Sequence, residues 1–296
     1  MMFLIKKIFF VVICFCILVS FVGCTATDVT KGGVETTDIY NKSLDAVKAA
    51  NSYDYEIVSK ESIQRALSSD PSDDVILDEE LNSTEKWETE DNIKGRLIQK
   101  PLSLEMIMKT SVLQQQDAVE SPALDLDSDN IELKIYVLEG KQYSYFSHWG
   151  VWNVADLRDI DWENLESINK QINPMYFLNL LGNDLAKEAV LETDEQHYIL
   201  SLENDEDEFI RKVKKIVGDN SQVSEARYKI WIDKETYLPT KVYFKYELTT
   251  DIGEYVDIRV HKSELSYRNF GAIDEIEVPD EAKDAITVEE FLENNI

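Results

Sequence analysis

Few residues in this chain combine in spacings that support catalysis or metal binding. The three histidines, His148, His197 and His261, are far apart and lack the HExxH and CxxH spacings of metal sites. None of the ten glycines forms a GxG motif, so the sequence has no phosphate-binding loop, dinucleotide fingerprint or GxSxG nucleophile elbow. We therefore expect no enzymatic activity, no metal and no cofactor.

One acidic segment imitates the start of a calcium-binding loop. Asp125, Asp127 and Asp129 have the alternating spacing of the first ligands of an EF-hand. The next requirements fail, because Asn130 stands where glycine is needed and Tyr136 stands where a bidentate glutamate is needed. We interpret the segment as a solvated acidic loop.

The cysteines point to a different chemistry, because Cys14, Cys16 and Cys24 all lie at the very start of the chain. The domain that follows has no cysteine, so it cannot form a disulfide, a thiolate metal site or a cysteine nucleophile. Its stability must come from the burial of apolar side chains.

The N-terminus has the pattern of an export signal. Lys6 and Lys7 precede the unbroken apolar run Ile8–Val19, which is shorter than the roughly 20 residues of a membrane span. The run leads into the sequence FVGC at 21–24, which resembles a bacterial lipobox despite a phenylalanine where leucine is usual. In a lipobox, the cysteine is diacylated on sulfur and becomes the new N-terminus.

We expect residues 1–23 to be a lipoprotein signal peptide and Cys24 to carry the acyl chains, with palmitate as a typical chain. The protein would then be attached to the extracytoplasmic face of the cell membrane. The alternative is an uncleaved membrane anchor in which Cys24 has no role. Residues 24–37 comprise this cysteine and a small, polar tether, and residues 38–296 are expected to fold as a single domain.

The charge of the chain excludes one class of partner. It has 30 basic and 58 acidic residues, for a formal net charge of -28. Nucleic acids require a basic surface, so neither DNA nor RNA is an expected partner.

The periodicity of the domain predicts strands with a few helices. One helix is expected to start at Thr36, Thr37 or Asp38 and to end near Asn51, and Tyr40, Leu44 and Val47 share its apolar face. A second helical region is expected over 161–181 with a break at Pro174, and a third helix over 205–217. Strands are expected from Tyr53 onward and over 81–99, 102–113, 131–138, 141–146, 149–155, 187–192, 197–202, 226–232, 239–248 and 255–265. This order predicts an α+β fold in which helices cover one face of a large, curled antiparallel sheet.

Two clusters in these elements could serve binding. Arg211, Lys212, Lys214 and Lys215 could contact anionic lipid head groups, but a solvated helix face is the simpler interpretation. Several aromatic residues could line the mouth of a cavity, insert into a membrane interface or belong to the core. These residues are Trp149, Trp152, Trp162, Tyr143, Tyr145 and Phe146.

The segment Trp231–Lys241, WIDKETYLPTK, resembles a hairpin of LolA-like proteins. In that hairpin an aromatic or aliphatic strand enters a turn with the pattern Asp-x-x-Thr-x-Leu-Pro. The Ser52-Tyr53 strand start and the ending Tyr267, Phe270-Gly271 and 276–279 are similar as well. The resemblance extends to uncharacterised LolA-like lipoproteins of Gram-positive bacteria, and it implies a curved antiparallel half-barrel whose concave side is closed by helices.

Two functions are open at this point. The resemblance implies binding of an apolar ligand, either a lipid or a lipidated partner, in the half-barrel. The alternative is a protein-interaction or envelope-sensing module without a small-molecule ligand. A binding protein should have a connected apolar cavity below its helices, whereas an interaction module should have a filled trough and an exposed apolar patch. We expect Tyr228, Ile230 and Ile232 to share one face, and Val242, Phe244 and Tyr246 to share the corresponding face of the next strand.

Overall fold

The computed structural model describes residues 30–31, 33–67, 83–117, 130–159, 172–203, 207–217, 221–253, 255–287, 289–290 and 293. The predicted signal peptide, Cys24, the three aspartates of the calcium-like segment and Trp162 lie outside these residues. The predictions made for them therefore stay predictions.

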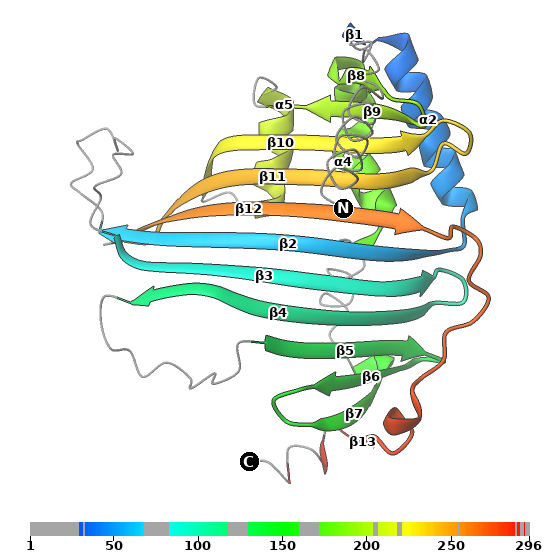
Figure 1. Cartoon of the computed structure of the whole chain (residues 1–296), viewed down its shortest axis with the longest axis vertical. Helices are drawn as coiled ribbons and strands as arrows, with labels where there is room; N and C mark the ends of the chain where they lie inside the picture. The colour runs from blue at the N-terminus through cyan, green and yellow to red at the C-terminus, as the bar shows by residue number, and fades with distance from the viewer. Residues whose placement is uncertain are drawn as a thin grey trace, which may run out of the picture.

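One large sheet organises the described residues (Figure 1). Its strand order is β1-β8-β9-β10-β11-β12-β2-β3-β4-β5-β6-β7-β13. Neighbouring strands are antiparallel, except that β13 runs parallel to β7. The strands are β1 (Thr30–Lys31), β2 (Ser52–Leu67), β3 (Ser83–Ile98), β4 (Ser103–Asp117), β5 (Asn130–Leu138), β6 (Lys141–Phe146), β7 (Val151–Asp156), β8 (Val190–Thr193), β9 (His197–Leu202), β10 (Ser221–Asp233), β11 (Pro239–Asp251), β12 (Tyr255–Arg268) and β13 (Ile286–Thr287).

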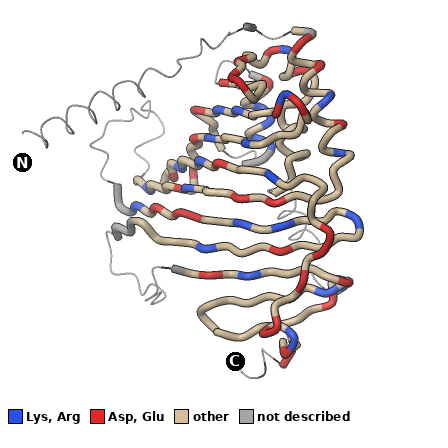
Figure 2. Tube along the Cα trace, turned by 45° about the vertical axis from the view of Figure 1, so that its right-hand side comes forward, with Lys and Arg blue, Asp and Glu red and all other residues tan. Residues whose placement is uncertain are grey.

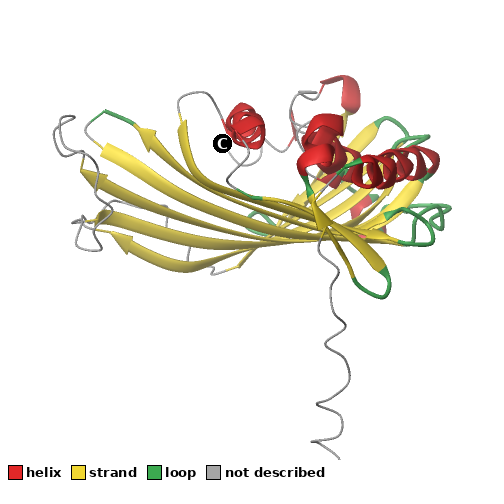
Figure 3. Cartoon of the chain, turned by 90° about the horizontal axis from the view of Figure 1, so that it is seen from above, coloured by secondary structure: helices red, strands yellow, loops and turns green. Residues whose placement is uncertain are grey.

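Three helices lie on the concave face of the curved sheet, over one end of its long strands (Figure 3). They are α2 (Val34–Ala49), α4 (Pro174–Glu188) and α5 (Asp207–Val217). The other ends of β2, β3, β4, β11 and β12 extend beyond the helices. This arrangement confirms the predicted α+β fold with helices on the concave face.

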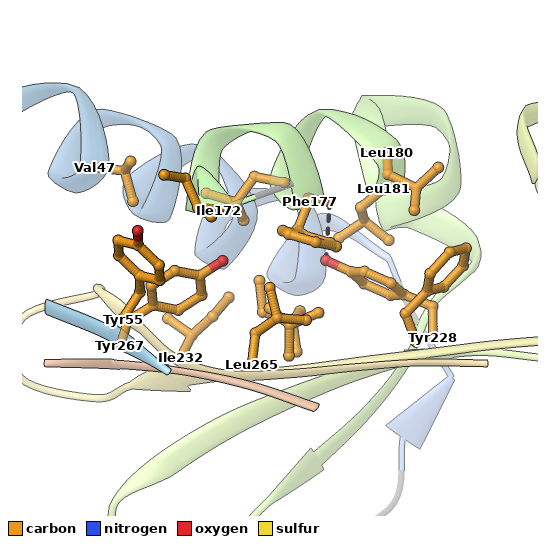
Figure 4. Packing of buried hydrophobic residues seen from close by; sticks show 14 of the residues in the cluster. Val47, Tyr55, Ile172, Phe177, Leu180, Leu181, Tyr228, Ile232, Leu265 and Tyr267 are labelled. Carbon is orange, nitrogen blue, oxygen red and sulfur yellow. Dashed lines mark hydrogen bonds between the residues drawn. The ribbon is translucent and has the colours of Figure 1, made fainter. Parts of the chain in front are cut away.

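The core lies between the helices and the strand side chains that alternate toward them. Tyr228 is paired with Phe244, and Ile230 with Val242, so the predicted shared faces of β10 and β11 are confirmed. All four side chains are buried. They belong to one core cluster with the helix residues Phe177, Leu181 and Phe209, and Figure 4 shows Tyr228 next to Phe177 and Leu181.

Two tyrosine hydroxyl groups tie this core to the backbone. The Tyr228 hydroxyl donates a hydrogen bond of 2.9 Å to the Phe177 carbonyl at the start of α4 (Figure 4). The Tyr55 hydroxyl on β2 reaches across β3 and donates to the Glu105 carbonyl of β4 at 3.0 Å. The residue in its path is Gly95 of β3, which has no Cβ. A Cβ at this position would lie 2.5 Å from the hydroxyl oxygen of Tyr55 and would block the contact.

Several predicted boundaries are wrong, and each has a local cause. Helix α2 begins at Val34 because Gly33 is its N-cap and Thr36 supplies the hydroxyl that accepts from the Gly33 amide at 3.0 Å. Helix α4 begins at Pro174, as the predicted break indicated, but it continues to Glu188 across a kink at Gly182, where φ is 63°. Strand β8 therefore starts at Val190 rather than at Lys187.

Acidic and basic residues are spread along the strands of the sheet (Figure 2), and several of them form ion pairs on its convex face. Cross-strand ion pairs such as Lys60–Glu90, at 2.6 Å, and Lys245–Glu225, at 2.7 Å, follow its strands. An exception is a small second cluster, in which Ile276 of the C-terminal segment packs with Ile98 and Tyr136. The convex face therefore remains solvated over β2, β3, β10 and β11 while the concave face holds the main core.

Candidate functional site

A pocket of about 240 Å³ lies on the concave face, where the cover of helix α4 ends. Tyr176 and Phe177 of α4 form one wall, and four adjacent strands, β11, β12, β2 and β3, form the floor. The floor residues are Ile57, Ser59, Asp91, Ile93, Phe244, Tyr246, His261, Ser263 and Leu265. A cavity bounded by apolar walls and a few convergent polar groups is typical of a site for a small ligand.

The pocket occurs where the strands change character. Along the concave face of β2, Tyr53, Tyr55 and Ile57 are followed by Ser59 and then by Glu61, Ile63 and Arg65. On β12 the same face changes from Leu265 through Ser263 and His261 to Arg259. Since residues two apart point to the same face of a strand, the pocket spans the border between the apolar core and a polar surface.

Aromatic rings form one side of this border. Tyr246 of β11 stacks on His261 of β12, with ring centroids 4.9 Å apart and an interplanar angle of 18°. Burial lowers the pKa of His261, and the nearby Arg259 charge lowers it further, although Asp91 acts in the opposite direction. His261 is therefore neutral at pH 7. Burial, with the Glu61 charge as a second cause, raises the pKa of Tyr246 to about 12.

The charged groups near the pocket are held by their neighbours. The Thr110 hydroxyl of β4 donates a hydrogen bond of 2.6 Å to Oδ1 of Asp91. Beyond the pocket, Arg259 Nε lies 3.4 Å from Oε1 of Glu61. Farther along the same face, Arg65 donates from Nε and Nη2 to both oxygens of Asp257, at 2.8 and 3.1 Å. The open end of the concave face thus carries ion pairs, interspersed with apolar side chains such as Leu248, which is 4% exposed.

The shared-face prediction located only part of the pocket. Phe244 and Tyr246 line it, whereas Ile230 and Tyr228 are fully buried in the core away from it. A substitution at Ile230 would therefore test folding and not binding. Asp91, His261 and Tyr176 were not predicted, because they come from distant segments and only the strand register brings them together.

The basic cluster on α5 is not a uniform solvated face. Lys212 Nζ donates to the carbonyls of Leu180 and Leu181, both at 3.1 Å, where the kink at Gly182 interrupts the hydrogen bonds of α4. Arg211 forms an exposed ion pair with Glu208 at 2.6 Å. Lys212 therefore joins two helices, which the sequence did not reveal.

The predicted aromatic cluster is divided between the two faces of the sheet. Trp152 lies on the convex face with Tyr145, with ring centroids 5.3 Å apart. Phe146 has the opposite orientation and contacts Trp149, which is 51% exposed. None of these four residues lines the concave pocket, but Tyr145 and Trp152 line a separate pocket of about 380 Å³.

Within the described part of the chain, no three histidine, cysteine, aspartate or glutamate side chains gather as metal ligands would. In the same residues, no helix is both long and apolar enough to span a membrane.

The chain belongs to a family of unknown function, DUF6612, whose model matches residues 35–287. A search among curated proteins gives no significant match.

Three solved structures show a limited similarity. LprF from Mycobacterium bovis has 10% identity and a TM-score of 0.36, and the match covers 86% of this chain and 100% of LprF. A DUF1329 family protein from Desulfovibrio piger has 11% identity and a TM-score of 0.24, with 84% and 96% of the two chains covered. A β-barrel-like DUF1849 protein from Brucella abortus has 11% identity and a TM-score of 0.19, with 74% and 100% covered.

Proposed function

We propose that the protein is an extracytoplasmic lipoprotein, anchored to the cell membrane through acylated Cys24, that binds an apolar ligand without chemically changing it. The ligand is a lipid or the acyl part of a lipidated partner, as the resemblance to LolA-like lipoproteins suggests. The observation that carries the proposal is the pocket on the concave face, with apolar residues at one end and polar residues at the other.

The composition of the pocket supports an amphipathic ligand. Ile57, Phe177 and Leu265 offer apolar surface next to the core, so an acyl chain would be removed from water there. Ser59 and Ser263 offer hydroxyl groups at the opposite end. At about 240 Å³ the pocket suits a segment of one chain, and the rest of the ligand would extend along the concave face beyond the described helices (Figure 3).

A second function, as a protein-interaction or envelope-sensing module, is favoured by two observations. The concave face below the helices is filled, since Tyr228, Leu181 and Leu265 are all at most 1% exposed. Large apolar side chains are also exposed outside the pocket, such as Leu113 at 50%. This alternative predicts that no small molecule accompanies the protein.

Organic extraction of the purified full-length protein, followed by mass spectrometry, tests the first proposal. We expect a lipid in addition to the acyl chains attached to Cys24. The matched variants are Ser59→Trp, which fills the pocket, and Ser62→Trp on the opposite face of the same strand. The extracted lipid should be lost in Ser59→Trp and retained in Ser62→Trp. Absence of lipid in the wild-type protein, or equal recovery from both variants, would favour the interaction module.

A further inference from the structure

The charge distribution around the pocket carries an inference about the head group of the ligand, which rests on the function proposed above. Asp91 is the one carboxylate among the described lining residues, which include no lysine or arginine, and burial lowers the pKa of His261. The pocket therefore has a local negative charge in a partly buried setting, where charges are screened less than in water.

The Asp91 carboxylate is positioned to accept one more hydrogen bond. Thr110 donates to Oδ1 at 2.6 Å, and this bond orients the carboxylate from the neighbouring strand. Among the residues that the structure describes, no side chain donates to Oδ2. A ligand group with an O–H or N–H can fill this position, whereas a carboxylate, sulfate or phosphate without a proton would add a second negative charge.

The nearest cation on the same face does not offset this preference. The Glu61 carboxylate offsets the charge of Arg259, with 3.4 Å between Nε and Oε1, although the buried Nε donates no hydrogen bond to a described residue. The whole chain carries a net charge of -28, so the long-range field also opposes anionic ligands. The charge of Asp91 and the net charge of the chain thus both disfavour an anionic head group.

We propose that the pocket selects amphiphiles whose head group donates hydrogen bonds and carries no negative charge, and that Asp91 determines this specificity. Ser59 and Ser263 accept or donate the remaining hydrogen bonds of such a head group. A fatty acid anion or an anionic phospholipid is disfavoured for the same reason.

Competition between two amphiphiles with the same tail tests this inference. The full-length protein in a polyoxyethylene detergent is equilibrated with hexadecylglycerol and hexadecyl sulfate, and the bound molecules are counted by native mass spectrometry. The sulfate is a permanent anion, so its charge does not change with pH. We expect the wild-type protein to prefer hexadecylglycerol by roughly tenfold, the ratio that corresponds to a modest charge interaction.

The variant Asp91→Asn keeps the acceptor for Thr110 and removes the charge, so the preference should fall to near one. The matched control is Glu90→Gln, which also removes one carboxylate. Glu90 precedes Asp91 on β3 but points to the convex face, where its Oε2 lies 2.6 Å from Nζ of Lys60. This control should keep the wild-type preference. If Asp91→Asn does not fold, Asp91→Ser makes the same test.

The outcomes separate the two proposals. Binding of both amphiphiles without preference, or a preference that Asp91→Asn leaves unchanged, would overturn the role of Asp91 while the proposed function stands. Failure of both amphiphiles to bind the wild-type protein would overturn the proposed function and this inference with it.

Discussion

The two ends of the concave face follow the same strands but are stabilised in opposite ways. Below the helices, β2 and β12 contribute Tyr53, Ile57 and Leu265, all at most 5% exposed. Beyond the helices, the same two strands contribute the ion pair Arg65–Asp257, which remains partly exposed. Burial of apolar area dominates the first end, and partly screened electrostatics dominates the second. The difference indicates that the open end stays in contact with water, so a ligand would lie between a hydrated surface and the buried core. We call the part of the concave face below the helices the dry end and the part beyond them the wet end.

The largest expected effect is the loss of stability when an apolar side chain is truncated at the buried end, compared with a truncation at the open end. Leu265→Ala removes a side chain that is 1% exposed, and we expect a loss of about 2–5 kcal/mol in the free energy of unfolding. Ile63→Ala at the open end removes a half-buried side chain and should cost about 1 kcal/mol or less. Urea unfolding measures both. Equal losses would contradict the division of the face into a dry and a wet end.

The second prediction concerns hydrogen bonds. Tyr228→Phe leaves the Phe177 carbonyl without its partner in the buried layer, at an expected cost of about 1–3 kcal/mol. Tyr246→Phe, at the border of the wet end, should change stability by less than about 0.5 kcal/mol. Thermal unfolding of the two variants gives the comparison, and a larger loss for Tyr246→Phe would reverse it.

A third prediction separates two lysines of α5. Lys212→Met removes both hydrogen bonds to the carbonyls at the kink of α4 and should cost about 1 kcal/mol. Lys214→Met changes the formal charge equally, and we expect an effect close to zero. Urea titrations of the pair test whether Lys212 joins the helices. Identical urea midpoints for the two variants would indicate that the whole basic cluster is a solvated helix face.

The alternation of residues predicted much of the dry end but little of the wet one. Tyr53, Tyr55 and Ile57 alternate with Asp54 and Glu56, so the start of β2 is visible in the sequence. Beyond Val58 both faces of the strand carry polar residues, and the periodicity that would mark its end at Leu67 disappears. A strand segment with polar residues on both faces lacks the alternation of apolar and polar residues that predicts a strand.

The pocket could not be predicted for a related reason. Phe244 and Tyr246 were grouped correctly because they lie on one strand. Asp91 and His261 come from strands far apart in the sequence, and only the pairing of β12 with β2 and of β2 with β3 brings them to one pocket. Strand order and register are tertiary facts, and the sequence of one strand does not specify its neighbours.

The smallest expected effect is a pH dependence at the border itself. Burial lowers the pKa of His261 in the folded protein, so the unfolded chain binds a proton more readily, at a pKa of about 6.5. Stability that depends on His261 is therefore complete above that value and decreases as the pH falls from there toward the folded pKa. His261→Gln should abolish this part of the decrease, whereas His148→Gln, at an exposed position, should retain it. The difference in unfolding free energy between wild type and each variant, measured by urea titration at several pH values, isolates this contribution from the carboxylates that titrate at lower pH. A wild-type and a His261→Gln protein with parallel pH profiles would mean that the ring is in contact with water, and the border between the dry and wet ends would then lie closer to Leu265.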